Sequence, residues 1–184
     1  MKSARLTTAH VLLILIQLVC GLVVWAARTS VATDAFNRAG PGLGADWAQL
    51  NPTWGDMDIT ANECRANGGS STEDIAGRWV GAGTFTNDQY ASVVLRTLTF
   101  GGDSNKIGVV ARASGDINAA RDYYGVVVRN NTNPPADRPT RLYKRVDGVL
   151  TTLAEVNAAW ALGDRIEIEA EGTTIRSLRN GTVI

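Results

Sequence analysis

Four segments in the C-terminal part of the chain decide the fold: KIGVVARAS (106–114), RDYYGVVVRNN (121–131), TRLYKRVDGVLTTL (140–153) and DRIEIEAEGTTIRSLRNGTVI (164–184). Each is rich in Val, Ile, Tyr or Thr, the residues that favour β-strands. Asp147-Gly148, Glu171-Gly172 and Asn180-Gly181 interrupt the segments, and such pairs are typical of tight hairpin turns. The pattern predicts serial hairpins and therefore an all-β, antiparallel sandwich or barrel.

Two pairings can be predicted within this region. Segment 106–114 should pair antiparallel with segment 121–131, which follows it across a short loop. Val146 and Val149 should lie opposite each other beside the Asp147-Gly148 turn, the strongest hairpin signal in the chain.

The strand signal is weaker before residue 106. We expect a short strand around Ala35 and Phe36, a glycine- and proline-rich loop, and then a hairpin within residues 49–60. The run YASVVLRTLTF (90–100) indicates a central strand of the sheet. The helix content of the domain should be very low.

The first 32 residues have the character of a secretory leader. MKSAR is a basic start, residues 11–27 are an apolar run of about 17 residues, and Ser30-Val31-Ala32 supplies small residues for cleavage after Ala32. An apolar signal helix therefore precedes a mature domain of residues 33–184, and secretion is expected. An uncleaved membrane anchor is the alternative, because the run is at the short limit of what spans a bilayer.

Charge and composition exclude several functions for the mature domain. Residues 33–184 carry 15 basic and 18 acidic side chains, so a nucleic-acid partner is not expected. A membrane contact would come only through an uncleaved leader. The only histidine, His10, lies in the leader, which excludes Ser-His-Asp and Cys-His nucleophiles from the domain. Cys64 is its only cysteine and should be a half-buried apolar residue.

A family resemblance rests on DAFNRAGPGLGADW (34–47) followed by GVVARAS, YYGVVVRNN, RLYKRVDGVLTTL and GDRIEIEAEGTTIRSLRNG in that order. This succession resembles the concanavalin A-like lectin/glucanase superfamily in its laminin-G-like jelly-roll form. The resemblance implies two packed antiparallel sheets, one concave, with carbohydrate or protein ligands on the concave face or on the loops at one rim. Such domains usually continue past the last Asn-Gly turn, so we expect a domain that is incomplete after Ile184.

Three carboxylates form the one candidate for catalysis. Glu167, Glu169 and Glu171 alternate along a predicted strand and should share a face. They are similar to the Glu-x-Asp-x-(x)-Glu motif of family 16 glycoside hydrolases, which have the same fold, but the central residue here is Glu. A retaining pair needs about 5 Å between carboxyl groups, closer than these spacings naturally give. We favour a solvated acidic face, with Arg176 and Arg179 as cross-strand partners.

Aromatic and cationic side chains on predicted strands are the candidate ligand-binding residues. Aromatic rings can stack on sugars, and arginine can donate hydrogen bonds to hydroxyl groups. Consecutive tyrosines at 123 and 124 must face opposite ways, so one of them should lie outside the core. The candidates are Tyr124, Arg129, Arg112, Tyr143 and Trp79.

Calcium is left open as a ligand, with no other cofactor expected. Asp34, Asp116 and Asp122 could hold it, although aspartates are common in turns that bind no metal. The sequence therefore predicts a secreted, non-catalytic lectin-like domain that binds an extracellular glycan or protein surface. A glycoside hydrolase using Glu167 and Glu171, and a structural adhesion or fibre module, are the alternatives.

Overall fold

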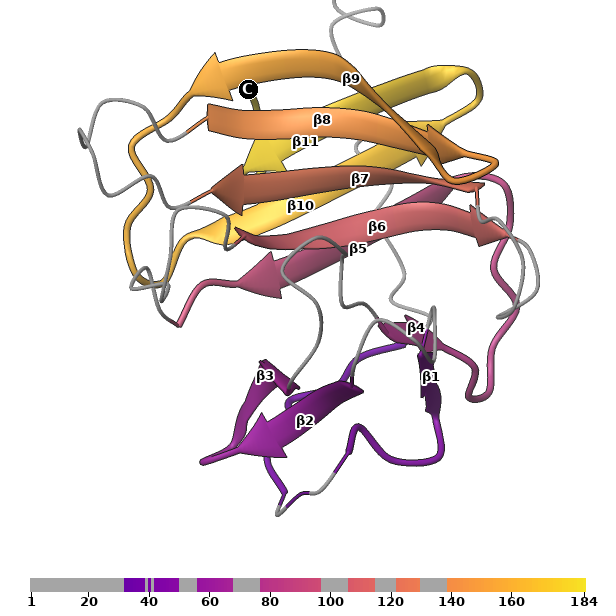
Figure 1. Ribbon diagram of the computed structural model, residues 1–184, viewed down its shortest axis with the longest axis vertical. Coiled ribbons are helices and arrows are strands. Elements are labelled where there is room, and N and C mark those ends of the chain that lie inside the picture. The colour runs from indigo at the N-terminus through magenta and orange to yellow at the C-terminus, as the bar shows by residue number, and fades with distance from the viewer. Residues whose placement is uncertain are drawn as a thin grey trace, which may run out of the picture. The chain divides into compact units, whose positions relative to one another are not determined.

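The computed structural model describes residues 32–38, 40, 42–49, 56–67, 77–96, 106–114, 122–129 and 139–184 (Figure 1). Within these ranges the chain forms β-strands and no helix, and every strand pair is antiparallel. The all-β, antiparallel prediction is confirmed. Among the same residues, no helix has the length and apolar character needed to span a bilayer. The leader predicted for residues 1–32 lies outside the described residues, apart from Ala32.

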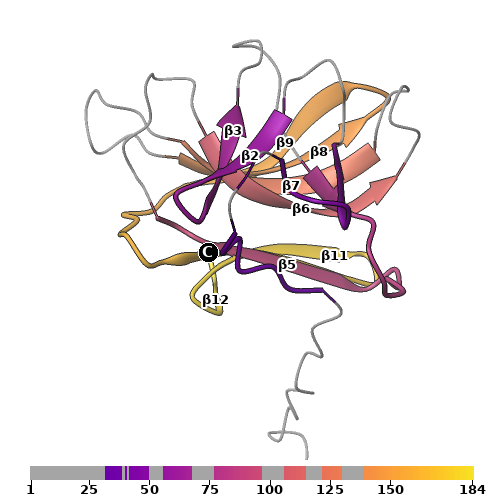
Figure 2. The ribbon, with the colours of Figure 1, turned by 90° about the horizontal axis from the view of Figure 1, so that it is seen from below.

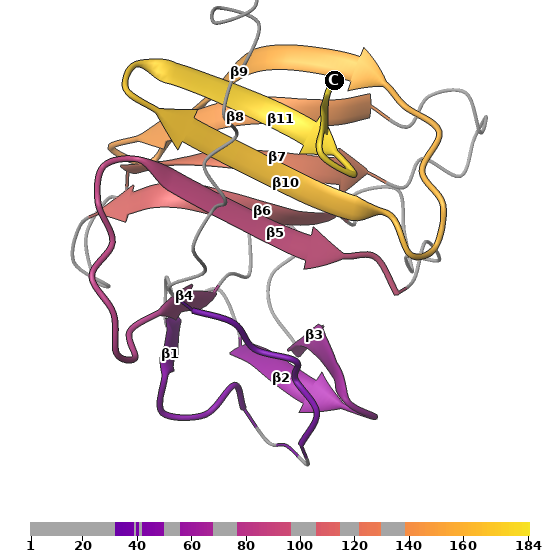
Figure 3. The same ribbon diagram turned by 180° about the vertical axis from the view of Figure 1, so that it is seen from behind.

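Eight strands form two four-stranded sheets. One sheet has the order β12-β11-β10-β5 and the other the order β6-β7-β8-β9. Figure 2 shows them as two layers, and Figure 3 shows the first sheet from its outer side. Their strands are β5 (Gln89–Val94), β6 (Lys106–Ser114), β7 (Asp122–Arg129), β8 (Pro139–Val146), β9 (Val149–Asn157), β10 (Arg165–Glu171), β11 (Thr174–Arg179) and β12 (Thr182–Val183).

The core lies between these two sheets because alternate residues of their strands face inward. Ile166 and Ile168 of β10 are fully buried against Val126 and Val128 of β7. Burying each such aliphatic side chain is worth about 1.5–3 kcal/mol, so this layer of contacts is the main stabilising feature of the sandwich. Trp160 joins the same cluster.

Both predicted strand pairings are confirmed, and so is the register predicted beside the Asp147-Gly148 turn. Strands β6 and β7 pair antiparallel, and Val146 faces Val149 across the β8–β9 turn. Asp147 and Gly148 both have positive φ, 48° and 78°, as a two-residue primed turn requires. These parts of the fold could be predicted because each turn and its strands are local in sequence.

Two smaller sheets are formed by the N-terminal part. Strand β1 (Trp47–Gln49) pairs with β4 (Gly77–Trp79), and β2 (Asp56–Thr60) pairs with β3 (Glu63–Asn67). Residues 50–55 of the hairpin predicted within residues 49–60 lie outside the described residues, and Asp56–Thr60 forms β2, which turns back at Ala61-Asn62 onto β3. Both turn residues have positive φ, 51° and 61°.

Two strand predictions are wrong. Residues 32–38 are not a strand, because the Asp34 carboxylate accepts the Phe36 N–H at 2.7 Å and Phe36 takes a positive φ of 53°. The described part of the run 90–100 is not a central strand: its strand is β5, and of the strands the structure describes, only β10 pairs with β5, while residues 97–100 lie outside the described residues. An apolar, β-branched sequence does not distinguish an edge from a centre, because that depends on distant pairing partners.

Candidate functional site

The three glutamates of β10 share the outer face of their sheet, as alternation predicts. Ile166, Ile168 and Ala170 face the core, so the glutamates point away from it. Their exposure differs greatly along the strand, since the side chains of Glu167, Glu169 and Glu171 are 0%, 16% and 66% exposed. The expectation of a solvated acidic face is therefore correct only at its Glu171 end.

Glu167 is held by three hydrogen bonds. Its carboxylate accepts from Arg165 Nε at 2.5 Å, from the Tyr90 hydroxyl at 2.7 Å and from the Gly181 amide at 2.8 Å. Burial raises the pKa of Glu167, but the bonds from Arg165, Tyr90 and Gly181 outweigh burial and the net pKa is lowered. Burial and the bond to the Glu167 carboxylate raise the pKa of Tyr90. This ionised, enclosed carboxylate ties β5, β10 and the β11–β12 turn together.

The other glutamates share one cation. Arg176 Nη1 donates to Glu169 at 3.2 Å and to Glu171 at 3.3 Å. Arg179, the second expected partner, instead pairs with Asp164 through Nη2 at 2.6 Å and lies over the Trp160 ring. All three glutamates of β10 therefore take part in ion pairs with arginines.

The outer face of the β6–β9 sheet carries a second, smaller cluster of buried rings. Tyr123 and Tyr143 are 2% and 3% exposed, with their rings edge to face at 6.0 Å, and Val127 lies against them. The Tyr143 ring occupies the space above Gly125, because a Cβ at that glycine would be 2.5 Å from the ring. Both tyrosines are thus packing residues of this face, and neither ring lies open for stacking on a sugar.

Cations gather at one end of the same face. Lys106 of β6 lies directly opposite Arg129 of β7, and Arg141 of β8 lies opposite Val127, one pleat from Arg129. These three residues, here named the basic row, thus occupy neighbouring strands, with Arg141 about 7–8 Å diagonally from Arg129. Glu155 of β9, opposite Arg141, adds a carboxylate 3.2 Å from Arg141 Nη2.

The arginines of the basic row have unsatisfied donors. The Nε atoms of Arg129 and Arg141 are buried and have no hydrogen-bond acceptor. A buried polar atom without a partner costs about 1–3 kcal/mol, so each such case in a folded protein calls for a reason. Both residues are half-buried.

The structure brings together only two of the five predicted ligand residues. Arg129 and Tyr143 share the outer face of the β6–β9 sheet, whereas Tyr124 packs against the main core on the opposite face. Trp79 lies in β4, edge to face with Trp47 at 5.6 Å. Sequence reasoning missed Lys106 and Arg141. The period-two alternation that relates Arg141 to Tyr143 could have found Arg141, whereas Lys106 needed the β6–β7 register.

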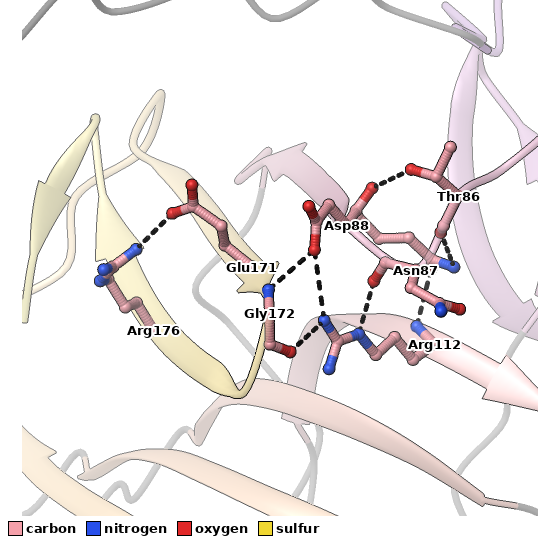
Figure 4. Close-up of polar contacts among 8 residues, drawn as sticks. Thr86, Asn87, Asp88, Arg112, Glu171, Gly172 and Arg176 are labelled. Atoms are coloured by element: carbon pink, nitrogen blue, oxygen red, sulfur yellow. Dashed lines mark hydrogen bonds and ion pairs between the residues drawn. The ribbon is translucent and has the colours of Figure 1, made fainter.

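Arg112, the fifth candidate, connects the two large sheets by hydrogen bonds (Figure 4). It occupies the bulge of β6 with a positive φ of 53°. Its Nε donates to the Asn87 carbonyl at 2.6 Å and its Nη2 donates to the Gly172 carbonyl at 2.7 Å. Asp88 accepts the Gly172 amide at 2.8 Å and lies 3.7 Å from Arg112. These donors of Arg112 therefore already have acceptors in the protein.

The two described calcium candidates, Asp34 and Asp122, each interact with different groups of the protein. Asp34 pairs with Arg38 at 2.7 Å and accepts Trp47 Nε1 at 2.8 Å. Asp122 accepts the Asp147 amide at 3.0 Å, and Asp116 lies outside the described residues. Within the described ranges no three His, Cys, Asp or Glu side chains cluster as a metal site. Cys64 is free and half-buried, as expected, and burial raises its pKa to about 11.

Comparison with known proteins gives no relative, since no protein-family model, curated protein or solved structure matches the chain.

Proposed function

We propose that the chain is a secreted, non-catalytic carbohydrate-binding domain with a laminin-G-like jelly-roll fold. The basic row, at one end of the outer face of the β6–β9 sheet, is the proposed binding surface. The observation that carries this proposal is the pair of buried Nε atoms on Arg129 and Arg141 that have no acceptor. Arginine donors that have no acceptor in the protein are suited to donate hydrogen bonds to oxygen atoms of a ligand.

The acidic strand supports the non-catalytic part of the proposal. Glu167 has no exposed surface and accepts three hydrogen bonds, so it is not placed as a nucleophile or a general acid. Glycoside hydrolysis needs two carboxyl groups on either side of a sugar, in reach of the bond that breaks. The ion pairs of Arg176 occupy Glu169 and Glu171 instead.

Glycan-array binding combined with an assay for released reducing sugar tests this proposal. We expect retention of one class of glycan with no product, and loss of retention in Arg129→Gln. Arg65→Gln is the matched control, because Arg65 is a 56% exposed arginine on β3. Release of sugar from any β-glucan, abolished by Glu167→Gln, would establish the hydrolase alternative and refute the proposal.

A structural role in assembly is the second candidate, and strand β9 favours it. Every residue of β9 is exposed, and of the described strands only β8 pairs with it. Val149, Leu153 and Val156 are 66%, 45% and 39% exposed, and an exposed apolar edge is prone to pair with another strand. Concentration-dependent sedimentation that Leu153→Lys abolishes would support this role. Monomeric sedimentation at all concentrations would exclude it.

A further inference from the structure

We infer that strand β9 pairs antiparallel with β9 of a second copy of the chain, an inference that rests on the structural role in assembly proposed above and not on glycan binding. All nine residues of β9 are exposed, and of the described strands only β8 pairs with it (Figure 1). At the other edge of the same sheet, the equally long β6 has only two exposed residues. Strand β9 therefore combines exposed side chains with the unpaired backbone groups of an edge strand.

The sequence of β9 lacks the residues that usually protect an edge. Lysine and proline oppose the addition of another strand. Strand β9 reads VLTTLAEVN, which contains neither, and Glu155 is its only charged residue. Its larger apolar side chains, Val149, Leu150, Leu153 and Val156, are 66%, 43%, 45% and 39% exposed. A strand that added to this edge would remove part of this apolar surface from water, which is favourable.

The partners on β8 show which way the side chains of β9 point, since paired residues share a face of the sheet. Val156 lies opposite Thr140, whose hydroxyl accepts a hydrogen bond from Trp160 of the main core. Val149 lies opposite Val146, which is an even number of positions from Thr140 on β8 and therefore shares its face. Both exposed valines of β9 thus lie on the core side of the sheet.

A bulge in β9 decides how two copies of the strand can match. The register with β8 shifts between Leu142 and Tyr143, which leaves Leu153 as an extra residue on β9. Because of this residue, Val149 and Val156 share a face although an odd number of positions separates them. When Val149 of one copy lies opposite Val156 of the other, residues 149–156 of both copies pair around a two-fold axis. This register places apolar side chains against each other at both ends of the pair.

The same register keeps like charges apart. Glu155 of one copy lies opposite Leu150 of the other, so the two Glu155 residues are five positions, or about 17 Å, apart along the strands. On β8, Arg145 lies opposite Leu150, which places a cation one strand beyond the interface from each Glu155. This charge complementarity argues for a second copy as the occupant of the edge. A two-fold interface uses the same edge of both copies, so association ends at a dimer.

Disulfide cross-linking of the full chain tests the inference. Cys20→Ser and Cys64→Ser first remove the two native thiols. In this background Thr152→Cys should cross-link to its own copy, because position 152 lies beside the two-fold axis, within the roughly 7 Å between α-carbons that a disulfide can span. Val149→Cys is the matched control. The proposed register separates its two copies by about 24 Å, so it should not cross-link.

Analytical ultracentrifugation of the full chain with its native cysteines measures the strength of the dimer. Val149→Lys places a lysine against Val156 of the other copy and should raise the Kd of the dimer by about ten-fold or more, because a desolvated, unpaired charge opposes pairing. Val80→Lys is the matched control, since Val80 is a 48% exposed valine outside β9. It should leave the Kd unchanged.

Three results would overturn the inference. A monomer at every concentration would refute both the pairing and the assembly role, and would leave glycan binding untouched. Equal cross-linking of Thr152→Cys and Val149→Cys would refute the two-fold register. A dimer that Val149→Lys does not weaken would place the interface elsewhere on the chain. All substitutions on β9 fall at exposed positions, and sedimentation of the unmodified chain decides the first result whether or not a variant folds.

Discussion

The ring of Tyr143 on β8 lies across the α-carbon of Gly125 on β7. The two residues are direct cross-strand partners, and a Cβ at position 125 would lie 2.5 Å from the ring carbon Cζ. Glycine inside a strand normally weakens it, so its presence here indicates a close approach of another group. The packing of the outer face of the β6–β9 sheet thus depends on residue 125 being a glycine, which has no side chain.

Gly125→Ala should destabilise the protein by about 1–3 kcal/mol, because the methyl group would overlap a ring that is only 3% exposed and cannot swing away. Urea unfolding would measure the change. The matched test repeats Gly125→Ala in a Tyr143→Ala background, where the overlap is gone. An equal cost in both backgrounds would show that the two residues are not coupled.

Arg112→Ala should lower the free energy of unfolding by about 1–3 kcal/mol. The change leaves the Asn87 and Gly172 carbonyls without their donor and keeps a Cβ at a positive φ of 53°. Arg112→Gly should cost less than Arg112→Ala, since glycine adopts this backbone conformation without strain. A ligand-binding role alone would instead give two stable variants with weakened binding, which unfolding and titration together would reveal.

Glu167→Gln should destabilise the protein by about 1–3 kcal/mol, because the neutral amide turns a donor toward Arg165, Tyr90 or Gly181. Glu171→Gln is the matched control. Glu171 is 66% exposed, and its loss should change stability by no more than about 0.5 kcal/mol. Thermal unfolding measures the loss of stability in both variants. A larger loss for Glu171→Gln than for Glu167→Gln would contradict the structural role assigned to Glu167.

Asp34 should make the stability of the N-terminal segment depend on pH. The hydrogen bond from Arg38 lowers the pKa of Asp34 from 3.8 to about 2, so the ionised form is favoured in the folded protein. This stabilisation, roughly 2 kcal/mol, is complete above pH 3.8 and is lost as the pH falls through about 2.

Asp34→Asn should therefore unfold more easily than the unmodified chain at neutral pH, with the difference shrinking toward about pH 2. Trp47, whose Nε1 donates to Asp34 at 2.8 Å, contributes to the fluorescence signal that follows the transition. Asp147→Asn removes one negative charge at an exposed turn and serves as the control. A stability difference that stays constant over the whole acid range would contradict the role of the carboxylate charge.

The sequence predicted those parts of the fold that depend on neighbours in the chain. The Asp147-Gly148 turn predicts β8, β9 and their register because the turn geometry and the flanking alternation agree. The edge position of β5 could not be predicted in the same way, since pairing with β10 brings together residues such as Tyr90 and Glu169 that are far apart in sequence.

The candidate site was predicted only in part for a related reason. Alternation shows that Tyr123 and Tyr124 face opposite ways, but which of them faces the main core depends on where the second sheet packs. The burial of Glu167 depends on Tyr90, which is 77 residues away in sequence. Arg129 and Tyr143 were predicted as ligand residues, and they do lie on one face. Alternation with Tyr143 could have added Arg141, whereas the position of Lys106 opposite Arg129 required the β6–β7 register.

The most direct test of the central claim is a map of backbone amide shifts by heteronuclear NMR during titration with the glycan that the array identifies. Our account predicts that the largest shifts lie at Lys106, Arg129 and Arg141, at one end of the outer face of the β6–β9 sheet. Shifts concentrated on residues 167–171 of β10 would contradict it, because they would place the ligand on the acidic strand of the other sheet.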